Sequence, residues 1–182
     1  LPIKRYYGLG VRAVKEKTTY PGWVDLGIKS DNGKQLLWSE YDVIGIDADG
    51  IATLASDNDS YHSTMFTWTQ AASIIGVASM PEGVSGTLRL PSYTEIGKLK
   101  EASTRSTFKW INTGVKGGKI TFNGQTIFYP ANGYYPGSLQ DQSVSARYWC
   151  GTEDVHGKLI ITFTSVGHNQ DVTDTDGHSV RL

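Results

Sequence analysis

An Asn-Gly pair between two alternating runs constrains the fold of this chain more than any other feature of its sequence. Residues 119–122 alternate polar and apolar side chains, and the β-prone run 126–129 follows Asn123-Gly124. Asn-Gly favours positive φ at both central positions of a two-residue hairpin turn. The pattern therefore predicts an antiparallel hairpin over residues 119–129.

Further strand and turn signals flank this hairpin. Apolar side chains alternate along residues 158–164, which predicts a strand, and residues 177–182 are expected to form a terminal strand. Residues 30–34 contain a second Asn-Gly pair and predict a turn. Residues 45–62 are rich in turn-forming side chains and are interpreted as a surface excursion.

Two capping boxes predict two helices. Thr67-Trp68-Thr69-Gln70 opens a helix that we expect over residues 68–77. Ser92-Tyr93-Thr94-Glu95 opens a second helix that we expect to reach about Ala102. The order of strands, two helices, long loops and further strands is typical of an α+β fold rather than of an alternating parallel sheet.

The bulk composition narrows the class of protein. Among 182 residues, 38% are hydrophobic, which is enough for a core, and 21 Gly against six Pro indicate many tight turns. The 17 basic and 18 acidic residues are well mixed and give a net charge of −1, which argues against a nucleic-acid partner. No run of 18 apolar residues exists, so direct membrane insertion is not expected. The chain opens with Leu1 and shows no signal-peptide pattern, which is consistent with a mature or trimmed form.

Metal and cofactor signals are weak. Residues 47–50 and 174–177 both read Asp-x-Asp-Gly, as pieces of calcium loops do, but an EF-hand starting at residue 47 has Ala52 at the glycine position and Asn58 at the last ligand position. Such tetrapeptides are mostly turn chemistry. We expect no metal and no cofactor, with calcium at these turns left open. The four histidines, which have no short ligand spacing, are His62, His156, His168 and His178.

Catalytic motifs are equally scarce. Cys150 is the single cysteine and allows no intrachain disulfide, and its apolar neighbours favour a buried small hydrophobe. Glu153 and Asp154 are adjacent, so on a strand they would point to opposite faces. No nucleophile elbow, phosphate loop or dinucleotide fingerprint is present. We therefore do not expect an enzyme, although a catalytic pair built from distant residues stays open.

The stretch from residue 130 to residue 176 carries the strongest functional signal. It is rich in Tyr, Asn, Gln, Asp, His and Ser, which together supply stiff amphipathic contact area and adaptable hydrogen bonding. Two interpretations remain open: a recognition surface, or polar loops that are simply solvated.

Seven short motifs occur in order along the chain. Three of them are Arg-Leu-Pro before a capped helix, Tyr-Trp after the long loop and a closing Gly-x-Ser-Val-Arg. The full set comprises residues 23–27, 36–38, 66–71, 88–95, 124–134, 148–153 and 177–181. Together these motifs resemble the major paralogous domain (Fib-succ-major type) of Bacteroidetes surface proteins. The resemblance covers residues 22–182, which we take as one domain, and leaves residues 1–21 as an N-terminal extension or connector.

The resemblance implies a C-type-lectin-like fold: small antiparallel sheets, two helices and long loops displayed on one side. Related domains lie at the ends of fimbrial tip proteins and in the variable proteins of diversity-generating retroelements. Family members usually carry Ser where this chain has Cys150, and residues 29–35 and 47–62 are longer than in the family. The Glu-Pro-Asn and Gln-Pro-Asp triplets of calcium-dependent lectins are absent, as is the cysteine pair of the formylglycine-generating relatives.

These observations lead to an extracellular or cell-surface recognition module of the adhesin type, associated with the outer membrane. Its expected partner is a glycan or protein ligand on a host or neighbouring cell. The alternatives are a structural tip or cap domain that contacts other subunits of a surface assembly such as fimbriae, and a hydrolase or transferase on the same scaffold. The predicted ligand-binding residues are Tyr134, Tyr135, Ser138, Gln140, Gln142, Tyr148, Glu153, His168, Asn169 and Asp171.

Overall fold

The computed structural model describes residues 20–182, apart from residues 63, 79, 81–87, 105, 153–154 and 171–172. Within that part of the chain, the structure consists mostly of small antiparallel sheets with two short helices, which is compatible with the expected α+β class. The elements are β1 (Trp23–Val24), β2 (Trp38–Ser39), β3 (Val43–Ile46), β4 (Ile51–Leu54), α1 (Trp68–Ala72), β5 (Gly76–Val77), α2 (Tyr93–Ala102), β6 (Phe108–Ile111), β7 (Gly117–Phe122), β8 (Gln125–Pro130), β9 (Ser145–Gly151), β10 (His156–Thr162) and β11 (Val166–Asn169).

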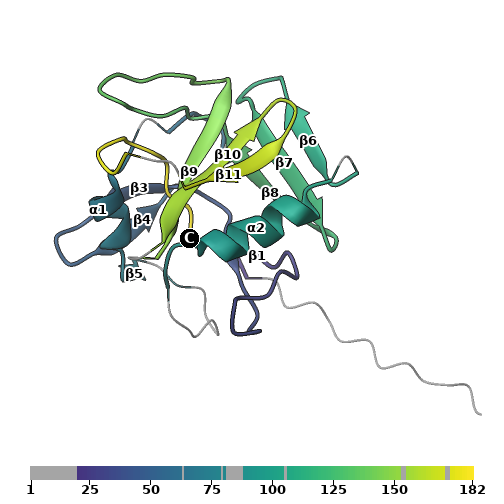
Figure 1. Ribbon diagram of the computed structural model, residues 1–182, viewed down its shortest axis with the longest axis horizontal. Helices are drawn as coiled ribbons and strands as arrows, with labels where there is room; N and C mark the ends of the chain where they lie inside the picture. The colour runs from purple at the N-terminus through teal and green to yellow at the C-terminus, as the bar shows by residue number, and fades with distance from the viewer. Residues whose placement is uncertain are drawn as a thin grey trace, which may run out of the picture.

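The sheet β11-β10-β9 lies at the middle of the molecule, with α2 packed against all three of its strands (Figure 1). Side chains alternate across β9. Tyr148 and Cys150 enter a core shared with α2 and β6–β8, whereas Trp149 enters a second core with Phe66 and Trp68. Because successive side chains of a strand point to opposite faces, β9 divides the two cores.

The predicted hairpin is confirmed. β7 and β8 pair in antiparallel register from Gly117↔Pro130 to Phe122↔Gln125. Asn123 and Gly124 connect them with φ values of 50° and 69°, as the Asn-Gly turn requires. The other Asn-Gly pair behaves differently, because only its Gly33 has a positive φ, 78°.

Both capping boxes are confirmed, and α2 ends at Ala102 as expected. The first helix is shorter than the predicted 68–77, because the chain leaves it at Ser73. The Ser73 hydroxyl donates to the Gln70 carbonyl at 2.7 Å, and the Ile75 amide donates to the Gly50 carbonyl at 3.0 Å. These contacts divert residues 76–77 into β5, which pairs in parallel with β4.

Three predictions made from the sequence need correction. Residues 45–62 are not only a surface excursion, since they include the end of β3 and all of β4, joined by a turn in which Asp47 Oδ1 accepts the amides of Asp49 and Ile51. The strand predicted at 158–164 ends at Thr162 and leaves Phe163 exposed beyond it. Residues 177–182 do not form a strand: Gly177, His178 and Ser179 each form an isolated bridge, and the backbone partner changes from one residue to the next.

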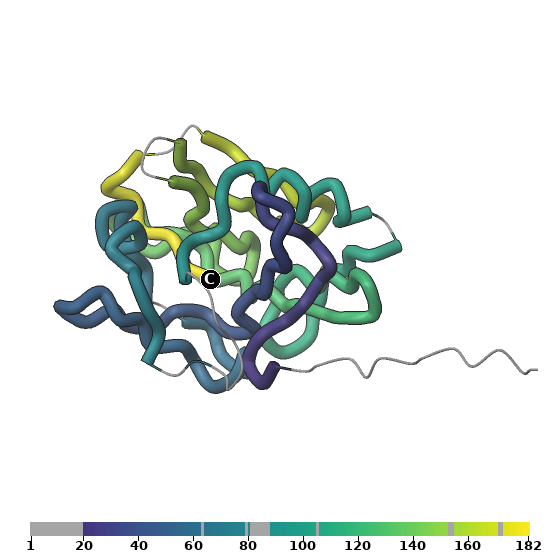
Figure 2. The backbone as a smooth tube through the Cα atoms, turned by 90° about the horizontal axis from the view of Figure 1, so that it is seen from below, coloured from purple at the N-terminus to yellow at the C-terminus, as the bar shows by residue number. Residues whose placement is uncertain are grey.

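The C-terminal residues run through the centre of the molecule (Figures 1 and 2). The Val43 amide donates to the Val180 carbonyl at 2.9 Å, and the Trp149 amide donates to the Ser179 carbonyl at 3.0 Å. The last residue, Leu182, is 4% exposed. The chain end therefore joins the early strands to β9, and its Val180 and Leu182 are part of the second core, together with Trp149.

The capping residue Glu95 makes stability depend on acid. Its carboxylate is fully buried, accepts the Ser92 amide at 2.8 Å and binds the Arg89 guanidinium at 2.6 and 2.7 Å. Burial alone would raise its pKa, but Arg89 and the Ser92 amide outweigh burial and hold the pKa below its usual value of 4.5. Stability from this group is therefore present above about pH 4.5 and is lost as the pH falls below it.

We predict that Glu95→Gln lowers the melting temperature at neutral pH and flattens its decline in acid, because the variant has no carboxylate to protonate. Glu101→Gln, on an exposed residue of α2, is the control. Thermal denaturation followed between pH 3 and 7 checks this. Equal acid sensitivity of Glu95→Gln and the wild type would contradict the assignment.

Candidate recognition surface

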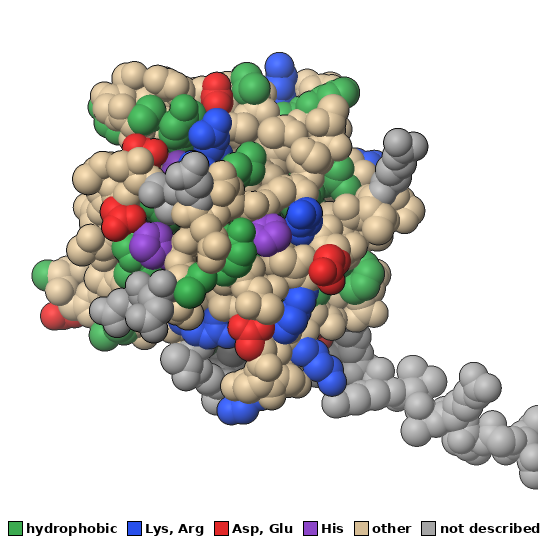
Figure 3. Space-filling model, in the orientation of Figure 1, with side chains coloured by type: hydrophobic (Ala, Val, Ile, Leu, Met, Phe, Trp, Pro, Cys, Tyr) green, Lys and Arg blue, Asp and Glu red, His purple; other side chains and the backbone are tan. Residues whose placement is uncertain are grey.

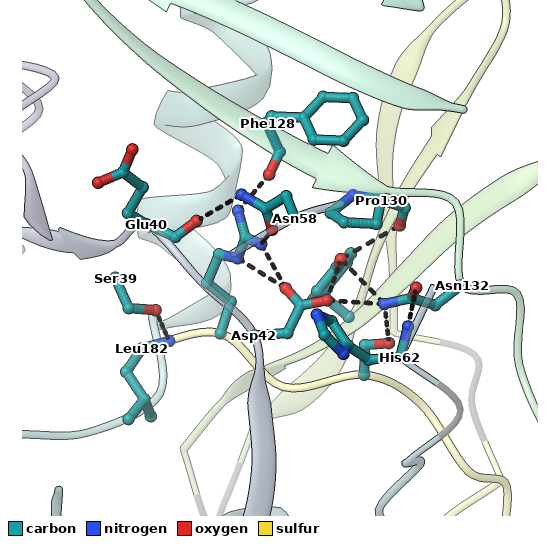
Figure 4. A network of polar contacts seen from close by, with 12 residues as sticks. Ser39, Glu40, Asp42, Asn58, His62, Phe128, Pro130, Asn132 and Leu182 are labelled. Carbon is teal, nitrogen blue, oxygen red and sulfur yellow. Dashed lines mark hydrogen bonds and ion pairs between the residues drawn. The ribbon is translucent and has the colours of Figure 1, made fainter. Parts of the chain in front are cut away.

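A buried ion pair lies within a network of polar contacts (Figure 4). Asp42 Oδ1 accepts the Arg181 Nε–H at 3.0 Å and a second bond from Arg181 Nη2, and neither residue exceeds 2% exposure. Asp42 Oδ2 accepts hydrogen bonds from the side-chain Nδ2 of Asn132 at 2.7 Å and from the Tyr148 hydroxyl at 3.0 Å. We call these four residues the Asp42 network. Every carboxylate oxygen in it has a donor, which a buried charge requires.

Asn132 and Arg181 of the network also contact residues outside it. Asn132 Oδ1 accepts the His62 amide at 3.0 Å, and the Arg181 guanidinium lies 4.6 Å from the centre of the Tyr129 ring. Burial, reinforced by the Asp42 charge, raises the pKa of the Tyr148 phenol well above its ordinary value. With its four residues at most 2% exposed, the network positions the chain and offers no exposed group to a substrate.

The network holds the start of a long loop, residues 131–144, which we call the late excursion. Gly133, directly after Asn132, has a φ of 80°, and a Cβ there would lie 2.0 Å from the Gln140 carbonyl oxygen, so only glycine fits. Tyr134 and Gln140 exchange backbone hydrogen bonds of 3.0 and 2.9 Å, and Tyr135 exchanges two of 2.8 Å with Gly177. The base of the late excursion is thus fixed by main-chain bonds at both ends.

A cation–π contact holds the same base from the side. The guanidinium carbon of Arg147 lies 3.6 Å from the centre of the Tyr134 ring, and Arg147 Nη2 pairs with Asp141 at 2.7 Å. The Tyr134 hydroxyl donates to Gln140 Oε1 at 3.1 Å. Arg147 thereby joins β9 to both arms of the late excursion.

Further aromatic rings form a series of contacts that runs from Tyr134 across β9. The His178 ring lies 5.9 Å from Tyr134 and 4.5 Å from Trp149. Trp149 meets Trp68 edge-on at 5.7 Å, and Trp68 carries the parallel His156 ring at 4.2 Å. Figure 3 shows histidine side chains among apolar side chains on this face of the molecule, over the β9–β11 sheet and α1.

Two of these histidines have distinct environments. His156 Nε2 lies 2.8 Å from Asp174 Oδ1, and the ring is partly exposed. His178 is fully buried, and neither of its ring nitrogens has a hydrogen-bond partner among the described residues. Burial, followed by the charges of Lys158 and Arg147, lowers the pKa of His178 to about 3, so it is neutral at physiological pH.

The late excursion brings together five of the predicted binding residues. Tyr135, Ser138 and Gln140 are exposed, whereas Tyr134 and Gln142 are partly buried. Next to Tyr135, which is 47% exposed, the excursion also exposes Leu139 and Val144. This part of the predicted surface is therefore contiguous in the chain and accessible.

Other predicted residues lie elsewhere. Tyr148 is 2% exposed within the Asp42 network, so its prediction as a ligand contact is wrong: its position on β9 turns the ring into the core. His168 of β11 is the strand partner of Leu159 of β10. Its ring contacts the ring of Tyr93 of α2 at 4.5 Å, away from the late excursion. Asn169, next along β11, is exposed and pairs with Lys158. Glu153 and Asp171 lie outside the described residues.

Sequence reasoning missed the residues that organise this surface. Arg147 and Trp149 alternate with the core residue Tyr148, so a period-two interpretation of residues 145–151 was the available signal. Trp68 and His156 come together from α1 and β10, for which no local pattern exists. Cys150 is buried as expected, and burial raises the pKa of its thiol to about 12.

Neither a metal-ligand cluster nor a known relative identifies a function for this surface among the described residues. Among the described residues, no group of three or more His, Cys, Asp or Glu side chains is placed to hold a metal ion. In the same part of the chain, no helix is long and apolar enough to cross a membrane. No family model matches the chain, and neither a curated protein nor a solved structure matches it.

We predict that Asp42→Asn lowers the free energy of unfolding by about 3–5 kcal/mol, because it leaves the buried Arg181 charge without its counter-ion. Asp49→Asn, on an exposed turn, should change it by less than about 0.5 kcal/mol. Urea denaturation measures both. A loss for Asp42→Asn no larger than that for Asp49→Asn would show that the network does not hold the fold.

Proposed function

We propose that this chain is an extracellular or cell-surface recognition module that binds a glycan or protein ligand through the late excursion. We further propose that it has a C-type-lectin-like fold and belongs with the major paralogous domains of Bacteroidetes surface proteins. Three of the motifs behind that resemblance contain residues of the Asp42 network: Asn132, Tyr148 and Arg181. Their burial gives those motifs a structural reason to be present.

The observation that carries the proposal is an exposed aromatic on a fixed base. Tyr135 is 47% exposed, yet its backbone is bonded to Gly177 in both directions. Ordering a loop on binding costs free energy, and a loop that is already held in place avoids much of that cost. Tyrosine beside Ser138 and Gln140 combines a stiff contact surface with hydrogen-bonding groups.

Two other functions remain as candidates. A tip or cap domain of a surface assembly is favoured by Leu139 and Val144, 41% and 59% exposed, which a neighbouring subunit could cover. A hydrolase is favoured by the His156–Asp174 pair, in which a carboxylate orients an imidazole as a general base requires. We retain the recognition module as the proposal because it accounts for both the exposed side chain of Tyr135 and the hydrogen bonds that hold its backbone.

The test is a glycan array together with capture of proteins from host-surface extracts, using the wild type and Tyr135→Ala. We expect Tyr135→Ala to weaken binding of the identified ligand by about tenfold or more, as loss of a central aromatic contact does. Phe163→Ala, at another exposed aromatic position, is the control and should bind as the wild type does. The proposed surface is wrong if a ligand is found whose binding is equal in all three proteins.

A further inference from the structure

The charges of this chain are balanced overall but not along its length. Residues 102–140 contain no Asp or Glu, although the whole chain has 18. The same stretch carries the basic residues Arg105, Lys109, Lys116 and Lys119. It includes all of β6, β7 and β8, so this three-stranded sheet contains no acidic side chain.

Two of the lysines face each other across the sheet. Lys109 of β6 and Lys119 of β7 are direct partners in antiparallel register, and both are exposed. Directly opposed residues share a face, with Cβ atoms about 4.5–5.5 Å apart, and like charges placed so destabilise a sheet. Among the described residues, neither lysine forms an ion pair. An external anion placed between the two ammonium groups would relieve this repulsion.

An aromatic ring continues the same row. Phe128 of β8 is the partner of Lys119 on its other side. A Cβ at Gly117 would lie 2.8 Å from Phe128 Cζ, so the ring lies over the glycine and is held close to the sheet. In the next row of this face, the hydroxyls of Thr121 and Thr126 are 2.9 Å apart. The outer face of β6–β8 therefore combines two opposed cations, an aromatic ring and a hydroxyl pair.

The two lysines and the aromatic ring together favour one chemical class of ligand. Lysine ammonium groups act as point charges that suit a tetrahedral oxyanion, whereas planar carboxylates are better matched by the arginine fork, which β6–β8 do not contain. Aromatic rings pack against the apolar faces of sugars. Nucleic-acid binding at physiological salt draws on many phosphate contacts, about 6–10 in strong binders, and this face offers two opposed lysines.

We propose that the outer face of β6–β8 binds a sulfated glycan, with a sulfate between Lys109 and Lys119 and a sugar ring against Phe128. Figure 1 shows these strands beside the β9–β11 sheet, and none of these three residues belongs to the late excursion. The site is therefore a second one, independent of the recognition surface proposed above.

The test measures binding of a heparin-derived octasaccharide, and of the same octasaccharide after chemical desulfation, by calorimetry at physiological salt. The double variant Lys109→Gln/Lys119→Gln should bind the sulfated form at least about tenfold more weakly than the wild type. Its melting temperature should be unchanged or slightly higher, because a like-charge pair is removed. The matched control, Lys29→Gln/Lys34→Gln, loses the same charge from an exposed turn and should bind as the wild type does.

Two further variants distinguish this site from the late excursion and from attraction by charge alone. Phe128→Leu keeps the backbone carbonyl that accepts from Arg181 and should weaken binding several-fold through loss of the ring. Tyr135→Ala should leave binding of the octasaccharide unchanged, whatever its effect on other ligands. The proposal is overturned by equal binding of the desulfated chain, by an equal loss in the Lys29/Lys34 control, or by equally tight binding of a single-stranded oligonucleotide.

Discussion

The buried pair of Asp42 and Arg181 is the interaction on which the rest of this structure depends. It joins residues 139 positions apart, and Asn132 and Tyr148 complete the set of donors around the carboxylate. Removing two charges from water costs several kcal/mol, which is recovered only when every oxygen and every N–H finds a partner in the right place. The pair therefore tolerates few alternative arrangements of the start of β3, the β8–β9 connection, β9 and the chain end.

The proposed recognition surface is held in place by this network. Asn132 is the residue before Gly133, near the start of the late excursion, and Tyr148 is the residue after Arg147, which closes the excursion against Tyr134. On β9 the alternation of side chains sends Tyr148 inward and Arg147 outward, so one strand serves both the network and the surface. Side chains held in this way would need little reorganisation to bind the proposed ligand.

The sequence predicted what is decided locally and missed what depends on distant partners. The Asn123-Gly124 hairpin and both capping boxes rest on residues within a few positions of one another, and all three are confirmed. Tyr148 was predicted at the surface because its neighbours suggested a binding loop, whereas its place in the core follows from contacts with Asp42, 106 residues away. The β3–β4 pair was not predicted from the sequence, because its two short strands lie among turn-forming residues. Likewise, a balanced overall charge did not reveal that Lys109 and Lys119 are direct partners across a sheet.

The account's central claim is that the late excursion is a fixed platform rather than a solvated loop, and hydrogen–deuterium exchange of its amides tests this most directly. The amides of Gly133, Tyr134 and Tyr135 donate to backbone carbonyls at 2.8–3.0 Å. We predict that these amides exchange slowly, at rates close to those of β9, and that Asp42→Asn accelerates them together with β9. Fast exchange of these amides in the wild type, at the rate of an exposed loop, would contradict the claim.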